Sequence, residues 1–315
     1  MASQDPGLPR PRAASSAGAA VRADAPALWD VVESLRPAQW VKNGFVFAAL
    51  IFSRNLTDRH ALTLVGGAFL AFCAVSSAAY LLNDVLDAEE DRKHPLKRMR
   101  PVAAGRVSPR LAIGASLALA LGGFVTAWEL DRRFFIVIAC YVVLNGLYSS
   151  VLKHVALVDV FVVAAGFVLR VLGGGTVIRV QISAWLIVCT TLLALFLALS
   201  KRRHELVLLG VDAAEHRPNL VDYSPYFLDQ LIAIVTASTV MSYALYTLSP
   251  DVRAKFPGKH LELTVPFVLF GIFRYLYLVH QREGGGNPTR LLLTDRVLLA
   301  VVLMWTASVI LLIYL

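Results

Sequence analysis

The stretch ALTLVGGAFLAFCAVSSAAYLLNDVLDAEED, residues 61–91, joins a long apolar segment to a cluster of carboxylates. Its first part, 61–82, contains no charged residue. An α-helix of about 20 residues crosses a hydrocarbon core of roughly 30 Å, so this part is long enough to span a membrane. Its last part, 83–91, carries five carboxylates. The stretch therefore predicts a transmembrane helix that ends in a polar site.

Apolar segments of the same kind recur along the chain. Of the 315 residues, 57% are apolar and only 17% are charged, where a soluble domain carries about 25% charged residues. We therefore predict an all-α integral membrane protein, a bundle of nine transmembrane helices. The predicted spans are 38–53, 61–82, 110–128, 134–151, 155–174, 182–200, 229–248, 264–281 and 297–314.

The chain divides into two parts on composition. Residues 1–27 are rich in Ala, Pro and Arg and contain no apolar segment of signal-peptide type. We expect them to form a disordered cytoplasmic tail. Residues 28–315 are expected to form one transmembrane catalytic domain.

The distribution of basic residues predicts the orientation. Most of the 30 Lys and Arg residues fall in the N-terminal tail and in every second connection, including 83–110 and 201–228. By the positive-inside rule, these segments and the N-terminus face the cytoplasm. The expected location is the plasma (inner) membrane, with a multi-pass topology and an active site that faces the cytoplasm.

The acidic cluster has the spacing of a metal site. Asn83, Asp87 and Asp91 share one helical face at i, i+4 and i+8, and Asp84 lies beside them. Carboxylates gathered in this way repel one another unless a cation bridges them. Hard oxygen ligands suit Mg²⁺, which commonly shares the phosphates of a substrate. The alternative is a solvated helix end, but ionisable residues close to the membrane are costly without a function.

Cationic and polar side chains accompany the acidic cluster at other predicted cytoplasmic helix ends. Fixed cations next to a carboxylate-bound metal form a composite phosphate site. Any one of these groups alone could be a topology signal, but all of them lie on the same predicted side. The candidate phosphate-binding residues are Lys42, Asn43, Arg92, Lys97, Arg100, Tyr148, Lys153, Lys201 and Arg202.

Two further charges lie within an apolar span. Asp159 and Arg170 are eleven residues apart and so share a similar helical face. At that depth we expect the two charges to be paired and to face a cavity. The alternative is a structural ion pair, either between these two residues or with a neighbouring helix.

The acidic motif resembles the first aspartate-rich motif of the UbiA superfamily of intramembrane prenyltransferases. The matching residues are Asn83-Asp84-x-x-Asp87-x-x-x-Asp91 on the second of nine predicted helices. The resemblance covers the chain from about residue 30 to its end. It implies a nine-helix bundle with its active-site loops on the cytoplasmic side.

One departure from the family pattern narrows the predicted function. Prenyl-diphosphate enzymes of the superfamily carry a second acidic motif after the sixth helix. Here the sequence Lys201-Arg202-Arg203-His204-Glu205 stands in that place, and only Asp212 and Glu215 follow. Two further motifs accompany it, Leu35-Arg36-Pro37-x-Gln39-Trp40-x-Lys42-Asn43 at 35–43 and Tyr148-Ser149-x-x-Leu152-Lys153 at 148–153. Together they are similar to the mycobacterial-type branch that transfers phosphoribosyl groups to decaprenyl phosphate.

The resemblance implies a definite reaction. A Mg²⁺-dependent pentosyltransferase would join the 5-phosphoribosyl group of phosphoribosyl diphosphate to decaprenyl phosphate and release diphosphate, for the arabinan (arabinogalactan) precursors of a cell wall. Asn83, Asp84, Asp87 and Asp91 would hold the metal, and the three aspartates would be the catalytic residues. The lipid phosphate is already anionic, so no strong general base is needed. We expect the lipid tail in an apolar groove that opens to the bilayer, no nucleic-acid partner, and an oligomeric state that the sequence leaves open.

Two other functions compete with this interpretation. An aromatic prenyltransferase of the same superfamily would make quinone or haem precursors, but it would need the second acidic motif. A non-catalytic lipid transporter would show inverted repeats and broken helices, and no such repeat is visible.

Overall fold

A computed structural model describes residues 28–93, 97–209, 222–282 and 286–315, and these contain helices, turns and loops but no strand. The elements in chain order are α1 (Leu28–Ser34), η1 (Pro37–Val46), α2 (Phe47–Phe52), α3 (Arg59–Leu86), α4 (Ala88–Lys93), η2 (Lys97–Met99), α5 (Pro109–Leu130), α6 (Arg132–Ser150), η3 (Leu152–His154), α7 (Val158–Val177), α8 (Ala184–Leu209), α10 (Pro225–Leu248), α11 (Pro250–Lys255), η6 (Leu261–Thr264), α12 (Val265–Gln281), α13 (Pro288–Thr294) and α14 (Arg296–Tyr314).

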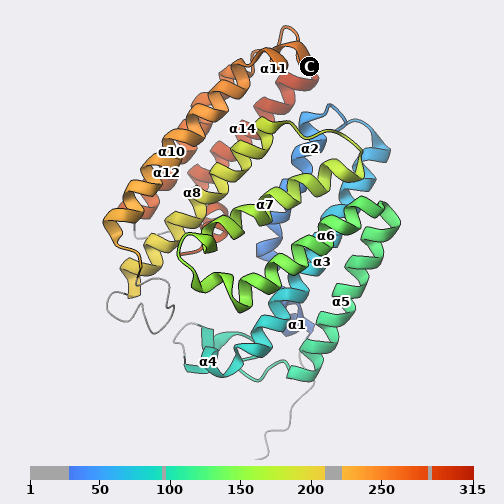
Figure 1. The fold of residues 1–315 in the computed structure, drawn as a ribbon, viewed down its shortest axis with the longest axis vertical. Helices are drawn as coiled ribbons and strands as arrows, with labels where there is room; N and C mark the ends of the chain where they lie inside the picture. Colours follow the sequence, from blue (N-terminus) through green and yellow to red (C-terminus); the bar gives the residue numbers. More distant parts are fainter. Residues whose placement is uncertain (1–27, 94–96, 210–221, 283–285) are drawn as a thin grey trace, which may run out of the picture.

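The predicted all-helical membrane bundle is confirmed. Among the described residues, eight helical segments are long and apolar enough to cross a membrane, and each matches one of the predicted spans. They pack as neighbours in a bundle, with α5 along α3 and α10 along α8 (Figure 1). The protein is therefore a multi-pass membrane protein.

The first predicted span, 38–53, differs from the expectation. The chain forms the 3₁₀ helix η1 there and then the short helix α2, instead of one continuous α-helix. Pro37 opens η1, and the buried Asn43 side chain is hydrogen-bonded to α3 and α7. A 3₁₀ helix rises about 2.0 Å per residue against 1.5 Å in an α-helix, so this segment reaches further per residue than predicted.

Glycines allow the close packing of η1 and α7. A Cβ atom on Gly174 would clash with the carbonyl oxygen of Val46, at the end of η1. A Cβ on Gly173 would lie 2.7 Å from the ring of Phe72 on α3. Small residues are the usual means by which membrane helices approach one another. The glycine run at 173–175 therefore places η1, which carries Lys42 and Asn43, against the centre of the bundle.

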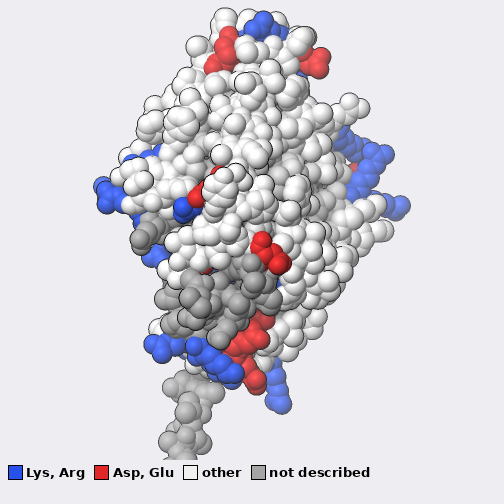
Figure 2. Space-filling view, turned by 60° about the vertical axis from the view of Figure 1, so that its left-hand side comes forward, with Lys and Arg blue, Asp and Glu red and all other residues white. Residues whose placement is uncertain are grey.

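The outer surface has the character of a lipid-facing protein. Large apolar side chains are exposed along the outer helices, for example Leu117 and Leu121 of α5, at 67% and 66%. Most charged side chains on the face shown in Figure 2 lie toward its lower end and along its edges, with uncharged residues between them. Such a surface is stable in a bilayer, where the outer residues contact lipid tails.

Some predictions fall outside the part of the chain that the structure describes. They are the tail at 1–27 and the two carboxylates Asp212 and Glu215. The cytoplasmic orientation and the single catalytic domain at 28–315 stay predictions.

Candidate active site

The acidic cluster lies where α3 passes into α4. Asp87 is the C-cap of α3, and two backbone hydrogen bonds carry the helical spacing across the junction. The amide of Asp87 donates to the carbonyl of Asn83 at 2.9 Å, and the amide of Asp91 donates to that of Asp87 at 2.8 Å. Asn83, Asp87 and Asp91 are thus spaced by successive helical turns. The Asn83 amide also reaches Ser149 of α6 at 3.4 Å.

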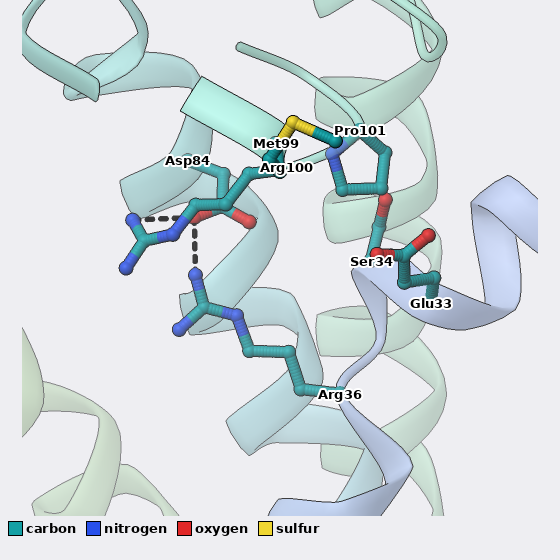
Figure 3. Close-up of a pocket in the computed structure, with 7 residues that line it drawn as sticks. All are labelled: Glu33, Ser34, Arg36, Asp84, Met99, Arg100 and Pro101. Atoms are coloured by element: carbon teal, nitrogen blue, oxygen red, sulfur yellow. Dashed lines mark hydrogen bonds and ion pairs between the residues drawn. The ribbon is translucent and has the colours of Figure 1, made fainter. Parts of the chain in front are cut away.

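Two arginines contact the buried carboxylates of this cluster. Arg100 Nη1 lies 3.2 Å from Asp84 and 2.6 Å from Asp91, so one nitrogen bridges both. Arg36 Nη2 also donates to Asp84, whose side chain is only 2% exposed. Figure 3 shows both guanidinium groups at Asp84, beside a pocket of about 240 Å³ lined also by Glu33 and Pro101. The carboxylates are compensated by protein cations.

The donor set fits a hard cation such as Mg²⁺. No group of three or more His, Cys, Asp or Glu side chains is gathered as a metal site within the described ranges. Yet a single cationic nitrogen already reaches both Asp84 and Asp91, so one positive centre can serve both carboxylates. Asn83 and Asp87, on adjacent turns, add oxygen donors of the type that Mg²⁺ prefers. Arginine and metal would exchange at these oxygens.

Arg36 belongs to the motif at 35–43 but was not among the predicted site residues. Its backbone lies in the left-handed region, with a φ of 54°, directly before Pro37. Its guanidinium lies 4.9 Å from the centre of the Tyr80 ring, in addition to its contact with Asp84. Strained backbone of this kind is concentrated at functional sites. Its place in that motif, directly before a proline, was the available signal.

The segment η1 is fixed to α3 and α7 by buried polar contacts. The indole of Trp40 donates to the Ser77 hydroxyl at 3.0 Å. The Asn43 amide donates to Cys73 Sγ at 3.2 Å, and its oxygen accepts from Arg170 Nε at 2.7 Å. These contacts hold η1 in one register, so Lys42 has a defined place between them.

Lys42 is surrounded by positive charge. Lys201, Arg170 and Arg36 all lie near enough to repel its ammonium group. The contacts of the described residues include no hydrogen bond or ion pair from Lys42 to an acidic side chain. Because no described acidic side chain pairs with Lys42 itself, this group of cations favours the binding of an anion with several negative charges. This group draws together residues from η1, α7 and α8.

Arg170 was expected to be paired, and its partners among the described residues are neutral. Its guanidinium donates to Asn43 Oδ1, to the Gly166 carbonyl at 2.8 Å and to the Tyr141 hydroxyl at 2.7 Å. It also lies over the ring of Tyr141, at 4.7 Å from its centre. Asp159 does not pair with Arg170, because its carboxylate contacts Arg202 instead. The positive charge of Arg170 is therefore held in place without a carboxylate partner.

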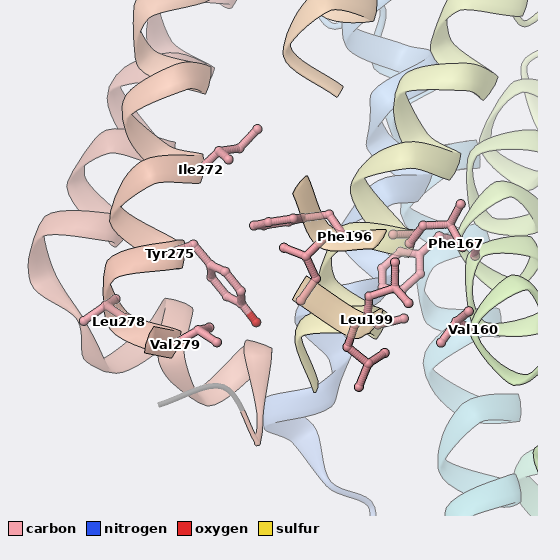
Figure 4. Close-up of a cluster of buried hydrophobic side chains, with 14 of the residues drawn as sticks. Val160, Phe167, Phe196, Leu199, Ile272, Tyr275, Leu278 and Val279 are labelled. Atoms are coloured by element: carbon pink, nitrogen blue, oxygen red, sulfur yellow. The ribbon is translucent and has the colours of Figure 1, made fainter. Parts of the chain in front are cut away.

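The end of α8 carries the last predicted cations. Arg202 contacts both Asp159 of α7 at 2.6 Å and Glu205 at 2.5 Å, and Lys201 Nζ lies 3.5 Å from Glu205. Above this end, Phe196 and Leu199 belong to a buried apolar cluster shared with α7 and α12 (Figure 4). This packing fixes the position of α8 along its axis and its rotation about that axis. It therefore also fixes where Lys201 lies.

Tyr223 extends this network to the segment before α10. Its hydroxyl accepts from the amide of Leu157 at 2.6 Å and donates to Asp159 at 3.1 Å. Burial raises the pKa of Tyr223 to about 12, so the phenol stays protonated at neutral pH. The sequence did not identify this residue, because no motif surrounds it.

The remaining predicted phosphate-binding residues lie around this end of the bundle. Arg92 donates from Nε to the carbonyl of Ala103 at 3.1 Å, Lys97 lies exposed on η2, and Lys153 lies on η3 directly after α6. Tyr148, in the last turn of α6, accepts from Arg202 at 3.1 Å. Their predicted roles in binding phosphate stay predictions.

An apolar groove runs along α7. It has a volume of about 460 Å³ and lies between α6 and α8. Small side chains of α7, Ala164 and Ala165, form its floor. The other lining residues are Cys140, Leu144, Phe161, Val168, Leu169, Ile187 and Thr191. The groove has the lining that a lipid chain requires.

Known proteins share both the sequence pattern and the fold. The model of the UbiA prenyltransferase family matches residues 44–294. The chain is 33% identical to a decaprenyl-phosphate phosphoribosyltransferase of Corynebacterium glutamicum, over 90% of this chain and 86% of the relative. It is 34% identical to a protein of the same name from Mycobacterium tuberculosis, over 89% of this chain and 92% of that relative.

A solved structure gives the same fold at lower sequence identity. The structure of a UbiA homolog from Archaeoglobus fulgidus, bound to GPP and Mg²⁺, superposes with a TM-score of 0.67. The alignment covers 91% of this chain and all of the other, at 18% identity. At that identity the likeness establishes the helical arrangement alone.

Proposed function

The chain belongs to the UbiA prenyltransferase family, and from this premise we propose that it transfers the 5-phosphoribosyl group of phosphoribosyl diphosphate to decaprenyl phosphate. Diphosphate is the second product. The names of the relatives, at 33% and 34% identity over about nine-tenths of the chain, support this assignment. The lipid product belongs to the supply of arabinan precursors for a cell wall.

One observation carries the choice of donor. Lys42 lies close enough to Arg170 and Lys201 to be repelled by both, and the described part of α8 carries Lys201, Arg202 and Arg203 where prenyl-diphosphate enzymes need a second acidic motif. Arg202 pairs with Asp159 and Arg203 pairs with Asp229, so the direct phosphate contacts would come from Lys42, Arg170 and Lys201. Phosphoribosyl diphosphate has phosphate groups at both C1 and C5, so it needs cationic contacts at two places. Arg and Lys hold phosphate directly, without a second metal cluster.

The acidic cluster suits the diphosphate end of this donor. Asn83, Asp84, Asp87 and Asp91 would hold Mg²⁺, which when bound offsets the negative charge that develops on the departing diphosphate. Arg36 and Arg100 already contact Asp84, so they lie close enough to turn toward a phosphate when the carboxylates bind metal. The three aspartates would thereby be needed for turnover.

The transfer itself requires little proton chemistry. An oxygen of the lipid phosphate attacks C1 of the ribose as the bond from C1 to the diphosphate oxygen breaks, with inversion at C1. The attacking phosphate is already anionic, so the protein does not have to remove a proton. What the protein contributes is orientation and charge, through Lys42 and Lys201 and through Arg36 and Arg100 at the acidic cluster.

The lipid acceptor arrives from the bilayer. The groove on α7 is apolar, and its lining residue Leu144 on α6 lies one helical turn before Tyr148, which contacts Arg202 of α8. A polyprenyl chain in this groove would bring its phosphate to the end of the bundle where these two residues meet. The site would lie on the cytoplasmic side of the plasma membrane, where phosphoribosyl diphosphate is available. The excess of basic residues in the connections that include 83–110 and 201–228 supports this orientation.

A coupled assay of diphosphate release tests this function. Purified protein is incubated with phosphoribosyl diphosphate or a prenyl diphosphate, each with decaprenyl phosphate or an aromatic acceptor. Release only from phosphoribosyl diphosphate with decaprenyl phosphate is the expected outcome. Consumption of the prenyl diphosphate with the aromatic acceptor would favour the aromatic prenyltransferase, and no release from any pair would favour a non-catalytic protein.

A further inference from the structure

Arg202 is the most deeply buried cation at the end of α8. Its side chain is 2% exposed, and the side chain of its partner Asp159 is fully buried. All three nitrogens of the guanidinium are engaged: Nε donates to Asp159 at 2.6 Å, Nη1 to Glu205 at 2.5 Å and Nη2 to Tyr148 at 3.1 Å. A phosphate could reach Arg202 only by displacing protein partners.

These contacts tie several elements together. Asp159 lies in the first turn of α7, Tyr148 in the last turns of α6, and Glu205 on α8. Asp159 also accepts from Tyr223, which precedes α10. One ion pair, between Arg202 and Asp159, therefore stands at the point where four segments around the site meet.

Arg202 also affects the strength of the ion pair between Glu205 and Lys201. Lys201 and Glu205 are one helical turn apart, a spacing that favours their pairing. In the structure Glu205 is 2.5 Å from Arg202 but 3.5 Å from Lys201. Because Arg202 also compensates Glu205, the charge of Lys201, whose side chain is 41% exposed, can be shared with an anion near Lys42.

We infer that Arg202 and Asp159 are positioning residues, which hold Glu205 and Tyr148 so that Lys201 is presented to the phosphate groups of the donor. This inference rests on the proposed function, because it takes phosphoribosyl diphosphate as that donor. It assigns to Arg202 an indirect role in place of the direct phosphate contact that its sequence position suggested.

The two roles of Arg202 predict opposite effects of a change at Asp159. If Arg202 bound phosphate directly, Asp159→Asn would release the guanidinium and leave donor affinity unchanged or higher. If the pair positions Lys201, Asp159→Asn and Arg202→Gln both weaken donor binding. The double variant then binds the donor no more weakly than either single variant does. Such non-additivity is the mark of residues that act as a unit.

The experiment measures KM for phosphoribosyl diphosphate and kcat at saturating decaprenyl phosphate. For both single variants we expect KM to rise about tenfold, the change that about 1.4 kcal/mol gives, with kcat within about threefold of wild type. Lys201→Met should raise KM by a similar factor and add little when combined with Asp159→Asn. An unchanged or lower KM for Asp159→Asn, with a raised KM for Arg202→Gln, would overturn the inference.

Two controls separate positioning from folding. Breaking one half of a buried pair can destabilise a protein, whereas an apolar replacement of both halves is often tolerated. Asp159→Leu with Arg202→Met should therefore keep the thermal unfolding temperature near that of wild type and still show the raised KM. Asp295→Asn is the matched control, because Asp295 pairs with Arg274 at 2.8 Å beside α14, and its KM should equal that of wild type.

The proposed function and this inference fail in different ways. If the unmodified protein releases no diphosphate from phosphoribosyl diphosphate, the proposed function is wrong. If the unmodified protein is active and Asp159→Leu/Arg202→Met has a wild-type KM, the function stands and the positioning role is wrong.

Discussion

At the scale of single residues, Asp87 and its neighbours differ in what compensates their charge. Asp84 and Asp91 contact Arg100, whereas the structure gives the Asp87 carboxylate no ion pair within the described residues. Asp87 thus has oxygens available to a metal without first losing an arginine. Changing it would remove a proposed metal ligand and would break no ion pair seen among the described residues.

Asp87→Asn should weaken the use of Mg²⁺. We expect the Mg²⁺ concentration for half-maximal turnover to rise by about tenfold, equal to about 1.4 kcal/mol of lost binding free energy. A metal titration of the rate of diphosphate release measures it. Asp251→Asn, on the exposed helix α11, is the control and should leave the titration unchanged. Normal Mg²⁺ dependence of Asp87→Asn would remove Asp87 from the metal site.

Lys42 gives a second prediction at this scale, with opposite effects on stability and on binding. Its charge is repelled by Lys201, Arg170 and Arg36. Lys42→Met should therefore stabilise the protein by about 1 kcal/mol, as removing strain from a functional site often does. The same variant should raise KM for phosphoribosyl diphosphate, because an anion-binding cation is lost. Thermal unfolding and steady-state kinetics on one preparation measure both, and a destabilised variant with normal KM would contradict the account.

At the scale of elements, the packing of η1 on α7 depends on a glycine. A Cβ on Gly174 would clash with backbone of η1, whereas one on Gly122 of α5 would meet no atom within 4 Å. Gly174→Ala should destabilise the protein by about 1–3 kcal/mol, the usual effect of overpacking. Gly122→Ala should be neutral or slightly stabilising, because Ala favours helix more than Gly does. Chemical unfolding in detergent compares the two, and equal stabilities would show that the close approach is absent.

The groove on α7 gives another prediction for an element. Ala165→Trp would fill its floor between α6 and α8. We expect a raised KM for long polyprenyl phosphates and little change for a short-chain analogue or for phosphoribosyl diphosphate. Leu117→Trp, on the exposed face of α5, adds the same ring outside the groove and should change neither. Equal effects of both variants on all acceptors would place the lipid chain elsewhere.

At the scale of the whole molecule, much of the fold follows from the sequence. Apolar runs of membrane length predicted eight helices that the structure contains, because the bilayer fixes the length of a spanning helix. The segment at 38–53 could not be predicted in the same way. Its 3₁₀ form depends on contacts with residues far along the chain, such as Arg170, and not on its own periodicity.

The helical spacing of the acidic cluster was predictable from the sequence, whereas many of the contacts around it were not. The spacing from Asn83 to Asp91 indicated a shared helical face from local geometry alone. Arg36 and Tyr141 were missed, because their roles come from tertiary contacts with Asp84 and Arg170. The pairing of Asp159 with Arg202 was also not predicted, because Arg202 lies on a different helix.

The central claim is that the donor is phosphoribosyl diphosphate and the acceptor is a polyprenyl phosphate. The most direct test follows a label on the ribose into the lipid phase. Purified protein with ribose-labelled phosphoribosyl diphosphate, decaprenyl phosphate and Mg²⁺ should move the label into the organic extract, and omission of the lipid should abolish the transfer. Label that stays in the aqueous phase, while a prenyl diphosphate is consumed under the same conditions, would contradict the account.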